Sequence, residues 1–72
     1  MTLKNTSAEM ELARQLNSVE GFIERYFYNL AYSATQLEAY ETTESEHERL
    51  FNRRRYTNYD SFRQIKNRKL RG

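Results

Sequence analysis

The chain has 72 residues, of which 38% are hydrophobic and 31% charged, with a formal net charge of +2 and neither cysteine nor proline. This length suits one small domain, so we expect residues 1–72 to form a single unit without separate catalytic and regulatory parts. Without cysteine, disulfide bonds are excluded. The hydrophobic content is too low for the chain to build a large hydrophobic core by itself. Association with a partner or a second copy is then the remaining source of stability.

The start of the chain and its least charged stretch indicate a protein of the cytoplasm. Residues 1–6 lack the apolar region and small-residue cleavage site of a secretory signal. The longest nearly uncharged run, residues 26–37, is far shorter than the roughly 20 residues that cross a membrane. We therefore expect a soluble, cytoplasmic protein without a membrane segment.

The two parts of the chain carry opposite charge. Residues 1–48 hold nine glutamates and three basic side chains, a balance of −6, whereas residues 49–72 hold nine basic side chains and one aspartate, a balance of +8. Such asymmetry is more informative than the net charge. The basic C-terminal segment, residues 49–72, can meet an acidic partner or the acidic part of its own chain.

A long first helix is predicted over about residues 7–41. Thr6 to Glu9 has the form of a capping box, and apolar or aromatic residues then recur at alternating steps of four and three, as in a heptad repeat. This pattern predicts a coiled-coil contact between helices. The positions of the heptad seam are Leu12, Leu16, Val19, Ile23, Tyr26, Leu30, Ser33, Leu37 and Tyr40.

Gly21 argues against one continuous rod, because glycine costs about 1 kcal/mol relative to alanine inside a helix. It follows Asn17 and Ser18, either of which can cap a new helix. The phase of the heptad seam continues through Gly21 unchanged, so we favour a single helix. A kink at Gly21, or a close approach of another helix there, is the alternative.

Between residues 22 and 34, apolar side chains cover most of the circumference of this helix, which indicates burial on more than one side. One side is expected to pack on the chain's own second helix. The other is expected to contact a second subunit or a larger protein, unless Tyr28 and Tyr32 are simply exposed. We therefore predict a homodimer or another homo-oligomer, or a subunit that folds against a partner. The predicted contact residues on this helix are Phe22, Tyr26, Phe27 and Leu30, because aromatic residues dominate interface energetics.

A break is predicted at residues 41–44, where paired threonines favour a turn. A second helix over about residues 45–56 then packs back on the first, and a short basic helix follows over about residues 61–70. If the first helix instead continued, charged residues would occupy the heptad seam, which is unfavourable when they are buried. The fold class is therefore all-α: a helical hairpin with a basic C-terminal helix, oligomerising or packed on a partner.

Side chains with catalytic or metal-binding potential are few. Glu44, His47 and Glu48 have the spacing of metal ligands on a helix, but such a short pattern is common by chance. We interpret it as a solvated helix start and expect no metal or other cofactor. The chain has no cysteine nucleophile, no Gly-x-Ser-x-Gly elbow and no glycine-rich loop. We therefore expect no catalytic residues and no enzymatic activity.

The basic C-terminal segment carries the clearest functional signal, because arginine and aromatic residues are interleaved in it. Arginine offers a planar fork to phosphate or carboxylate, and an aromatic ring can stack on a base. Four interpretations stay open. The segment can dock on an acidic protein, contact nucleic acid, or form a solvated face, or Arg49 and Arg53 can pair with Glu38 and Glu41 of the same chain. The predicted partner-binding residues of this segment are Arg49, Arg53, Arg54, Arg55, Tyr56 and Arg63.

These patterns favour a non-catalytic regulatory or assembly protein. It is expected to bind a larger macromolecular partner, in the first place a protein, through its aromatic helix face and its arginine-rich end. The alternative is a nucleic-acid-binding regulator that dimerises through the first helix and contacts phosphates through residues 49–71. Salt separates the two, because phosphate contacts weaken steeply as salt rises.

Overall fold

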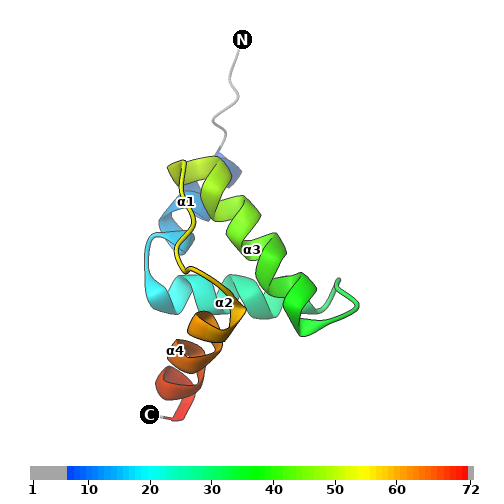
Figure 1. The fold of residues 1–72 in the computed structure, drawn as a ribbon. Helices are drawn as coiled ribbons and strands as arrows, with labels where there is room; N and C mark the ends of the chain where they lie inside the picture. Colours follow the sequence, from blue (N-terminus) through cyan, green and yellow to red (C-terminus); the bar gives the residue numbers. More distant parts are fainter. Residues whose placement is uncertain (1–6, 72) are drawn as a thin grey trace.

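The computed structural model describes residues 7–71, and four helices account for most of this part of the chain (Figure 1). The predicted all-α class is confirmed. The molecule is elongated, 43 × 25 × 21 Å, with α1 and α4 at opposite ends and α2 packed on α3 between them. The helices are α1 (Ser7–Leu16), α2 (Val19–Leu30), α3 (Gln36–Phe51) and α4 (Tyr59–Arg71).

The predicted first helix over residues 7–41 is wrong, because a corner separates α1 from α2. Ser18 has an extended backbone (φ −118°, ψ 158°), and its hydroxyl accepts a hydrogen bond from the Gly21 amide at 2.9 Å. Ser18 is therefore the N-cap of α2. The cap expected at Thr6 for the first helix lies outside the described residues.

Gly21 lies where the end of α1 meets the start of α2. A Cβ atom at this position would be 1.8 Å from the Gln15 carbonyl oxygen, which no side chain can tolerate. The close approach considered for Gly21 therefore exists, and the approaching backbone is the last turn of α1. Glycine is required here because the two helices approach too closely to leave room for a side chain.

A second corner, over residues 31–35, separates α2 from α3. Thr35 caps α3 by accepting from the Glu38 amide at 3.0 Å, and the Glu38 carboxylate accepts from the Ala34 amide at 2.7 Å. Two backbone amides at the start of α3 thus each donate to a side chain, in an arrangement close to a capping box. The heptad seam is in consequence distributed over three helices, and Leu37 is 52% exposed.

The predicted break at residues 41–44 is also wrong, since α3 runs straight through it. The Thr43 hydroxyl donates to the Ala39 carbonyl at 2.8 Å, one turn earlier, so this threonine is satisfied inside the helix. The predicted helix over residues 45–56 is instead the end of α3 followed by a loop, residues 52–58. The basic C-terminal helix predicted over residues 61–70 is present as α4, slightly longer at both ends.

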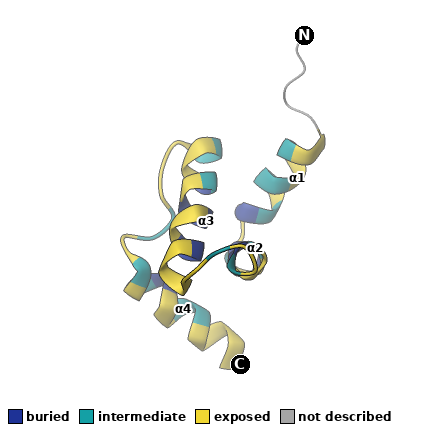
Figure 2. Cartoon of the chain, turned by 90° about the vertical axis from the view of Figure 1, so that its right-hand side faces the viewer, coloured by how far each residue is buried: buried dark blue, intermediate teal, exposed yellow. Residues whose placement is uncertain are grey.

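The core is largely aromatic and is completed by α4. The Phe62 ring of α4 lies 5.5 Å from Phe22, 4.9 Å from Tyr26 and 5.1 Å from Tyr40, centroid to centroid. Figure 2 shows the buried positions turned toward the centre, where the helices meet. The chain therefore covers part of its aromatic helix with its own C-terminal helix. The buried hydrophobic residues are Leu16, Phe22, Ile23, Tyr26, Ala39, Tyr40 and Phe62.

A polar cluster ties α2 to α3 beside this core. Arg25 donates to both oxygens of Glu46, at 2.9 and 2.8 Å, and the Asn29 amide donates to Glu46 at 3.1 Å and to Thr43 at 3.0 Å. Burial alone would raise the pKa of Glu46, but the hydrogen bonds from Arg25 and Asn29 outweigh it and hold that pKa below its usual value.

Among the described helices, none is both long and apolar enough to cross a membrane.

Candidate functional site

The loop between α3 and α4 is built around one buried carboxylate. The Glu44 side chain is fully buried and accepts from the backbone amides of Arg55 at 2.8 Å and Tyr56 at 2.9 Å. The Tyr40 hydroxyl donates to the same carboxylate at 2.6 Å. Burial, followed by this hydrogen bond, raises the pKa of Tyr40. Glu44 was expected at a solvated helix start, and it instead holds the loop onto α3.

His47 anchors the same loop one turn later on α3. Its Nδ1 atom lies 2.7 Å from the Arg53 carbonyl oxygen, and because a carbonyl can only accept, Nδ1 carries the proton. The imidazole is buried, with its centroid 4.6 Å from that of the Phe51 ring. Glu44 and His47 are therefore both engaged with the loop. Residues 7–71 contain no group of three or more His, Asp or Glu side chains arranged to hold a metal ion.

Two of the three consecutive arginines in this loop turn toward their own chain. Arg54 donates to Glu41 at 3.2 Å and to the Tyr40 hydroxyl at 3.2 Å. Arg55 donates to the Leu16 carbonyl at 3.2 Å. These two predicted partner-binding residues are thus occupied with α1 and α3.

Arg53 is different, because its side chain is exposed and has no ion pair within residues 7–71. The loop therefore leaves one of its three arginines to the solvent. Tyr56, another predicted contact residue, is half-buried, with its ring 5.4 Å from the Phe22 ring.

Other cations of the basic C-terminal segment reach the acidic part of the chain. Arg49 pairs with Glu9 at 2.9 Å, and Lys69 pairs with Glu20 at 2.8 Å. The expected pairing of Arg49 with Glu38 or Glu41 is wrong, because its partner is Glu9 of α1. Self-pairing of the two oppositely charged parts is nevertheless a real feature of the fold.

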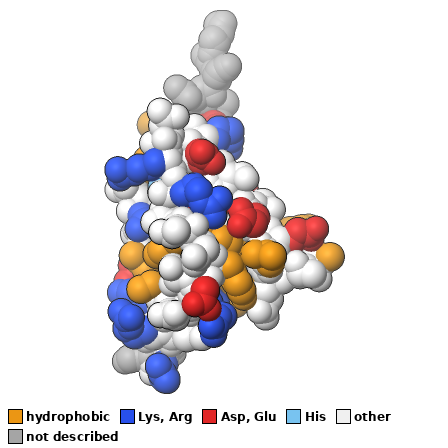
Figure 3. Space-filling model, in the orientation of Figure 1, with side chains coloured by type: hydrophobic (Ala, Val, Ile, Leu, Met, Phe, Trp, Pro, Cys, Tyr) orange, Lys and Arg blue, Asp and Glu red, His pale blue; other side chains and the backbone are white. Residues whose placement is uncertain are grey.

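The outer face of α4 is where cations stay in the solvent. Helix periodicity places five exposed residues opposite the buried Phe62. Asp60, the one carboxylate of α4, accepts from Arg63 at 2.6 Å and from Gln64 at 3.0 Å. Figure 3 shows Lys and Arg side chains gathered at the end of the molecule that α4 forms. The residues of the outer face are Arg63, Gln64, Asn67, Arg68 and Arg71.

The predicted aromatic contact face is mostly interior. Phe22 and Tyr26 belong to the core of this chain, so they are not available as anchors on its surface, and Leu30 is half-buried. Phe27 alone among these four is exposed, at 44%. The sequence-based expectation failed because residues of α4, distant in sequence, cover the helix at Phe22 and Tyr26.

Exposed rings instead gather near the end of α2. Tyr28 and Tyr32 are 52% and 78% exposed, and their ring centroids are 5.3 Å apart. The guanidinium of Arg25 lies 4.4 Å from the Tyr28 centroid. The rings of Tyr28 and Tyr32 form the aromatic end of α2, whereas the Phe27 ring lies 5.1 Å from the ring of Tyr26.

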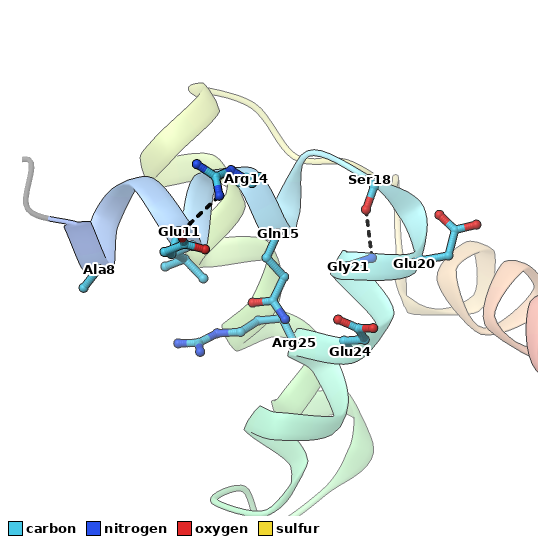
Figure 4. A pocket seen from close by; sticks show the side chains of 10 residues that line it. Ala8, Glu11, Arg14, Gln15, Ser18, Glu20, Gly21, Glu24 and Arg25 are labelled. Carbon is cyan, nitrogen blue, oxygen red and sulfur yellow. Dashed lines mark hydrogen bonds and ion pairs between the residues drawn. The ribbon is translucent and has the colours of Figure 1, made fainter.

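Two hollows in the surface are lined by charged side chains. The larger, about 550 Å³, lies beside α1 and α2, where the Glu11–Arg14 pair, Glu20 and Glu24 give it mixed charge (Figure 4). The smaller, about 320 Å³, has a basic lining without a carboxylate. It is lined by Asn17, His47, Phe51, Arg53, Arg54 and Arg55.

Comparison with protein-family models, with curated proteins and with solved structures finds no match for this chain.

Proposed function

We propose that this protein binds nucleic acid without catalysing a reaction, and that the outer face of α4 is its contact surface. The supporting observation is the way in which the cations differ. Arg49 and Lys69 are paired with glutamates of their own chain, whereas Arg68 and Arg71 are exposed and have no ion pair within residues 7–71. Guanidinium groups on one helix face suit the phosphate oxygens of a nucleic acid backbone.

The composition of the outer face favours nucleic acid over an acidic protein as the partner. A protein interface needs apolar or aromatic anchors at its centre, with charge at the rim. The outer face of α4 is polar throughout, and the one exposed apolar residue of this helix, Leu70, lies beside it. Charge without an apolar centre is typical of contact with phosphates.

Fluorescence anisotropy with a labelled random-sequence DNA duplex at 50 and 200 mM salt tests the proposal. Removing two phosphate contacts in Arg68→Ala/Arg71→Ala is expected to reduce the salt slope by about 2 and to weaken binding at low salt about tenfold or more. The matched control is Arg14→Ala on α1, an exposed arginine paired with Glu11. It should bind like the wild type. Wild-type protein that shows no salt-dependent binding, or a double variant that binds unchanged, would refute the proposal.

A protein partner is the second candidate, favoured by the aromatic end of α2. Exposed rings of this kind suit a protein interface, and they replace Phe22 and Tyr26 in the expected regulatory or assembly role. This candidate includes a homo-oligomer that forms through the same rings in the cytoplasm. Sedimentation equilibrium of the wild type and of Tyr28→Ser/Tyr32→Ser tests the homo-oligomer. A dimer that the variant loses supports self-association through these rings, and monomers at every concentration exclude self-association.

A further inference from the structure

We infer that α4 reads double-stranded DNA in the major groove. This inference rests on the proposed nucleic-acid-binding function and names its substrate class. Its starting point is that the outer face of α4 is not purely cationic. Two exposed amide side chains, Gln64 and Asn67, stand between Arg63 and the pair Arg68 and Arg71. Phosphates need only cations, whereas amides and arginines together match base edges: arginine with guanine, and glutamine or asparagine with adenine.

The spacing of these residues suits a helix that lies in the groove. They follow one another at steps of one, three, one and three from residue 63 to residue 71, which keeps them on one side of the helix. At 1.5 Å per residue they extend about 12 Å along the axis. Since stacked base pairs are about 3.4 Å apart, this length corresponds to three or four base pairs.

Asp60 orders the N-terminal part of this face before any ligand arrives. It accepts from one guanidinium nitrogen of Arg63 at 2.6 Å and from the Gln64 amide nitrogen at 3.0 Å. The Gln64 carbonyl oxygen and the remaining donors of Arg63 are left free for a base edge. Holding the two side chains in place lowers the entropy lost on binding.

The placement of the aromatic residues separates duplex DNA from other nucleic acids. Single strands are bound by stacking bases on exposed rings, but the rings of α4 face inward: Phe62 is buried, and Tyr59 is half-buried with its hydroxyl donating to Gln36 at 3.0 Å. Duplex RNA has a deep, narrow major groove that side chains cannot read. The major groove of B-form DNA admits an α-helix.

The position of α4 leaves its outer face open to a long ligand. It forms one end of the molecule, with α1 at the other (Figure 1). Phe62 and the Lys69–Glu20 pair hold it to α2 and α3 from one side only. A duplex can therefore approach the outer face from the side away from α2 and α3.

The test begins with selection of bound sites from a random-sequence duplex library by the full chain. Anisotropy then compares the selected duplex with its single strand, with an RNA duplex of the same sequence and with a random duplex. The selected DNA duplex is expected to bind at least about tenfold more tightly than each of the others. Gln64→Ala and Asn67→Ala should each weaken binding to the selected site roughly tenfold and barely change binding to the random duplex.

Controls separate base reading from phosphate contact. Arg71→Ala should weaken binding to the selected and random duplexes alike, and Asn17→Ala, an exposed amide on the α1–α2 corner, should change neither. Gln64 and Asn67 are exposed, so their variants should keep the helical circular dichroism of the wild type.

Three results would overturn the inference. Equal binding to single strands or to duplex RNA, or duplex binding with no sequence enriched in the selection, would remove groove reading and leave the proposed function standing. Absence of binding to every nucleic acid would remove the proposed function and this inference together.

Discussion

Two neighbouring segments, the loop at residues 52–58 and α4, are both rich in arginine but use it in opposite ways. In the loop, Arg54 and Arg55 turn inward, because Glu41, Tyr40 and the end of α1 offer acceptors within reach. In α4, no other helix of residues 7–71 offers an acceptor to the outer face, so Arg68 and Arg71 stay in the solvent and Arg63 pairs only with Asp60 of the same helix. The number of arginines in a segment therefore does not reveal a binding surface. The acceptors on the elements packed beside it do.

The largest effect is expected from Glu44→Ala, which would release the loop. Two backbone amides and the Tyr40 hydroxyl would lose a buried acceptor, at a cost on the order of 4 kcal/mol in the free energy of unfolding. Urea denaturation followed by circular dichroism measures it. Glu48→Ala, an exposed neighbour on the same helix, should stay within about 0.5 kcal/mol of the wild type. Equal stability of the two variants would contradict the role of Glu44.

The next effect is on stability and depends on pH. It concerns Arg25, which binds Glu46 of the same chain. Because the folded protein holds the pKa of Glu46 below its usual 4.5, the unfolded chain binds this proton more tightly. The stabilisation is therefore complete above the unfolded value and is lost as the pH falls through the lowered folded value. Arg25→Gln should lose about 2 kcal/mol at pH 7 and less at pH 3. Urea midpoints at both pH values measure this, and a loss that does not change with pH would contradict it.

A smaller effect compares the loop directly with α4. Arg54→Ala removes the bonds to Glu41 and to the Tyr40 hydroxyl and should cost about 1 kcal/mol of stability. Arg68→Ala, on the outer face, should cost less than about 0.5 kcal/mol. The two variants should rank in the opposite order when nucleic acid affinity is measured, because Arg68→Ala should bind more weakly than Arg54→Ala. If the two variants rank the same way in both measurements, the distinction between the segments fails.

The smallest effect is expected from Asp60→Asn. Removal of the one carboxylate of α4 should raise affinity for a random duplex about two- to threefold, because a charge of the same sign as the phosphates is lost. Discrimination between the selected and the random duplex should fall, since asparagine offers one acceptor oxygen where Asp60 offers two, and Arg63 and Gln64 can then no longer both be held. Anisotropy on both duplexes measures the two changes. Glu11→Gln, at the far end on α1, is the control and should change neither.

The helical class and the C-terminal helix could be predicted because apolar periodicity and caps are local properties. The division of the first helix was harder. Ser18 and Gly21 signalled the first corner, yet the heptad phase passed through it, since helices on both sides of a corner can direct apolar residues to one core. The second corner also had a local signal, Thr35 followed by Glu38, without a glycine or proline to mark it.

The candidate site was less accessible to sequence reasoning, because it depends on contacts between distant residues. Whether Phe22 faces a partner or its own chain is decided by Phe62, forty residues further along the chain. Glu44 is buried rather than solvated because loop amides eleven and twelve residues later reach it. Composition drew attention to residues 49–72, and only the packing distinguishes the inward-facing arginines from those on the outer face of α4.

The contact at Gly21 has a consequence for recognising related chains. With no room for even a methyl group between Gly21 and the end of α1, a relative with any other residue there would have to hold these two helices at a different angle. A capping serine followed three residues later by glycine, in front of an aromatic residue, is thus a marker of this corner. It can be sought in sequences too divergent for their overall similarity to be detected.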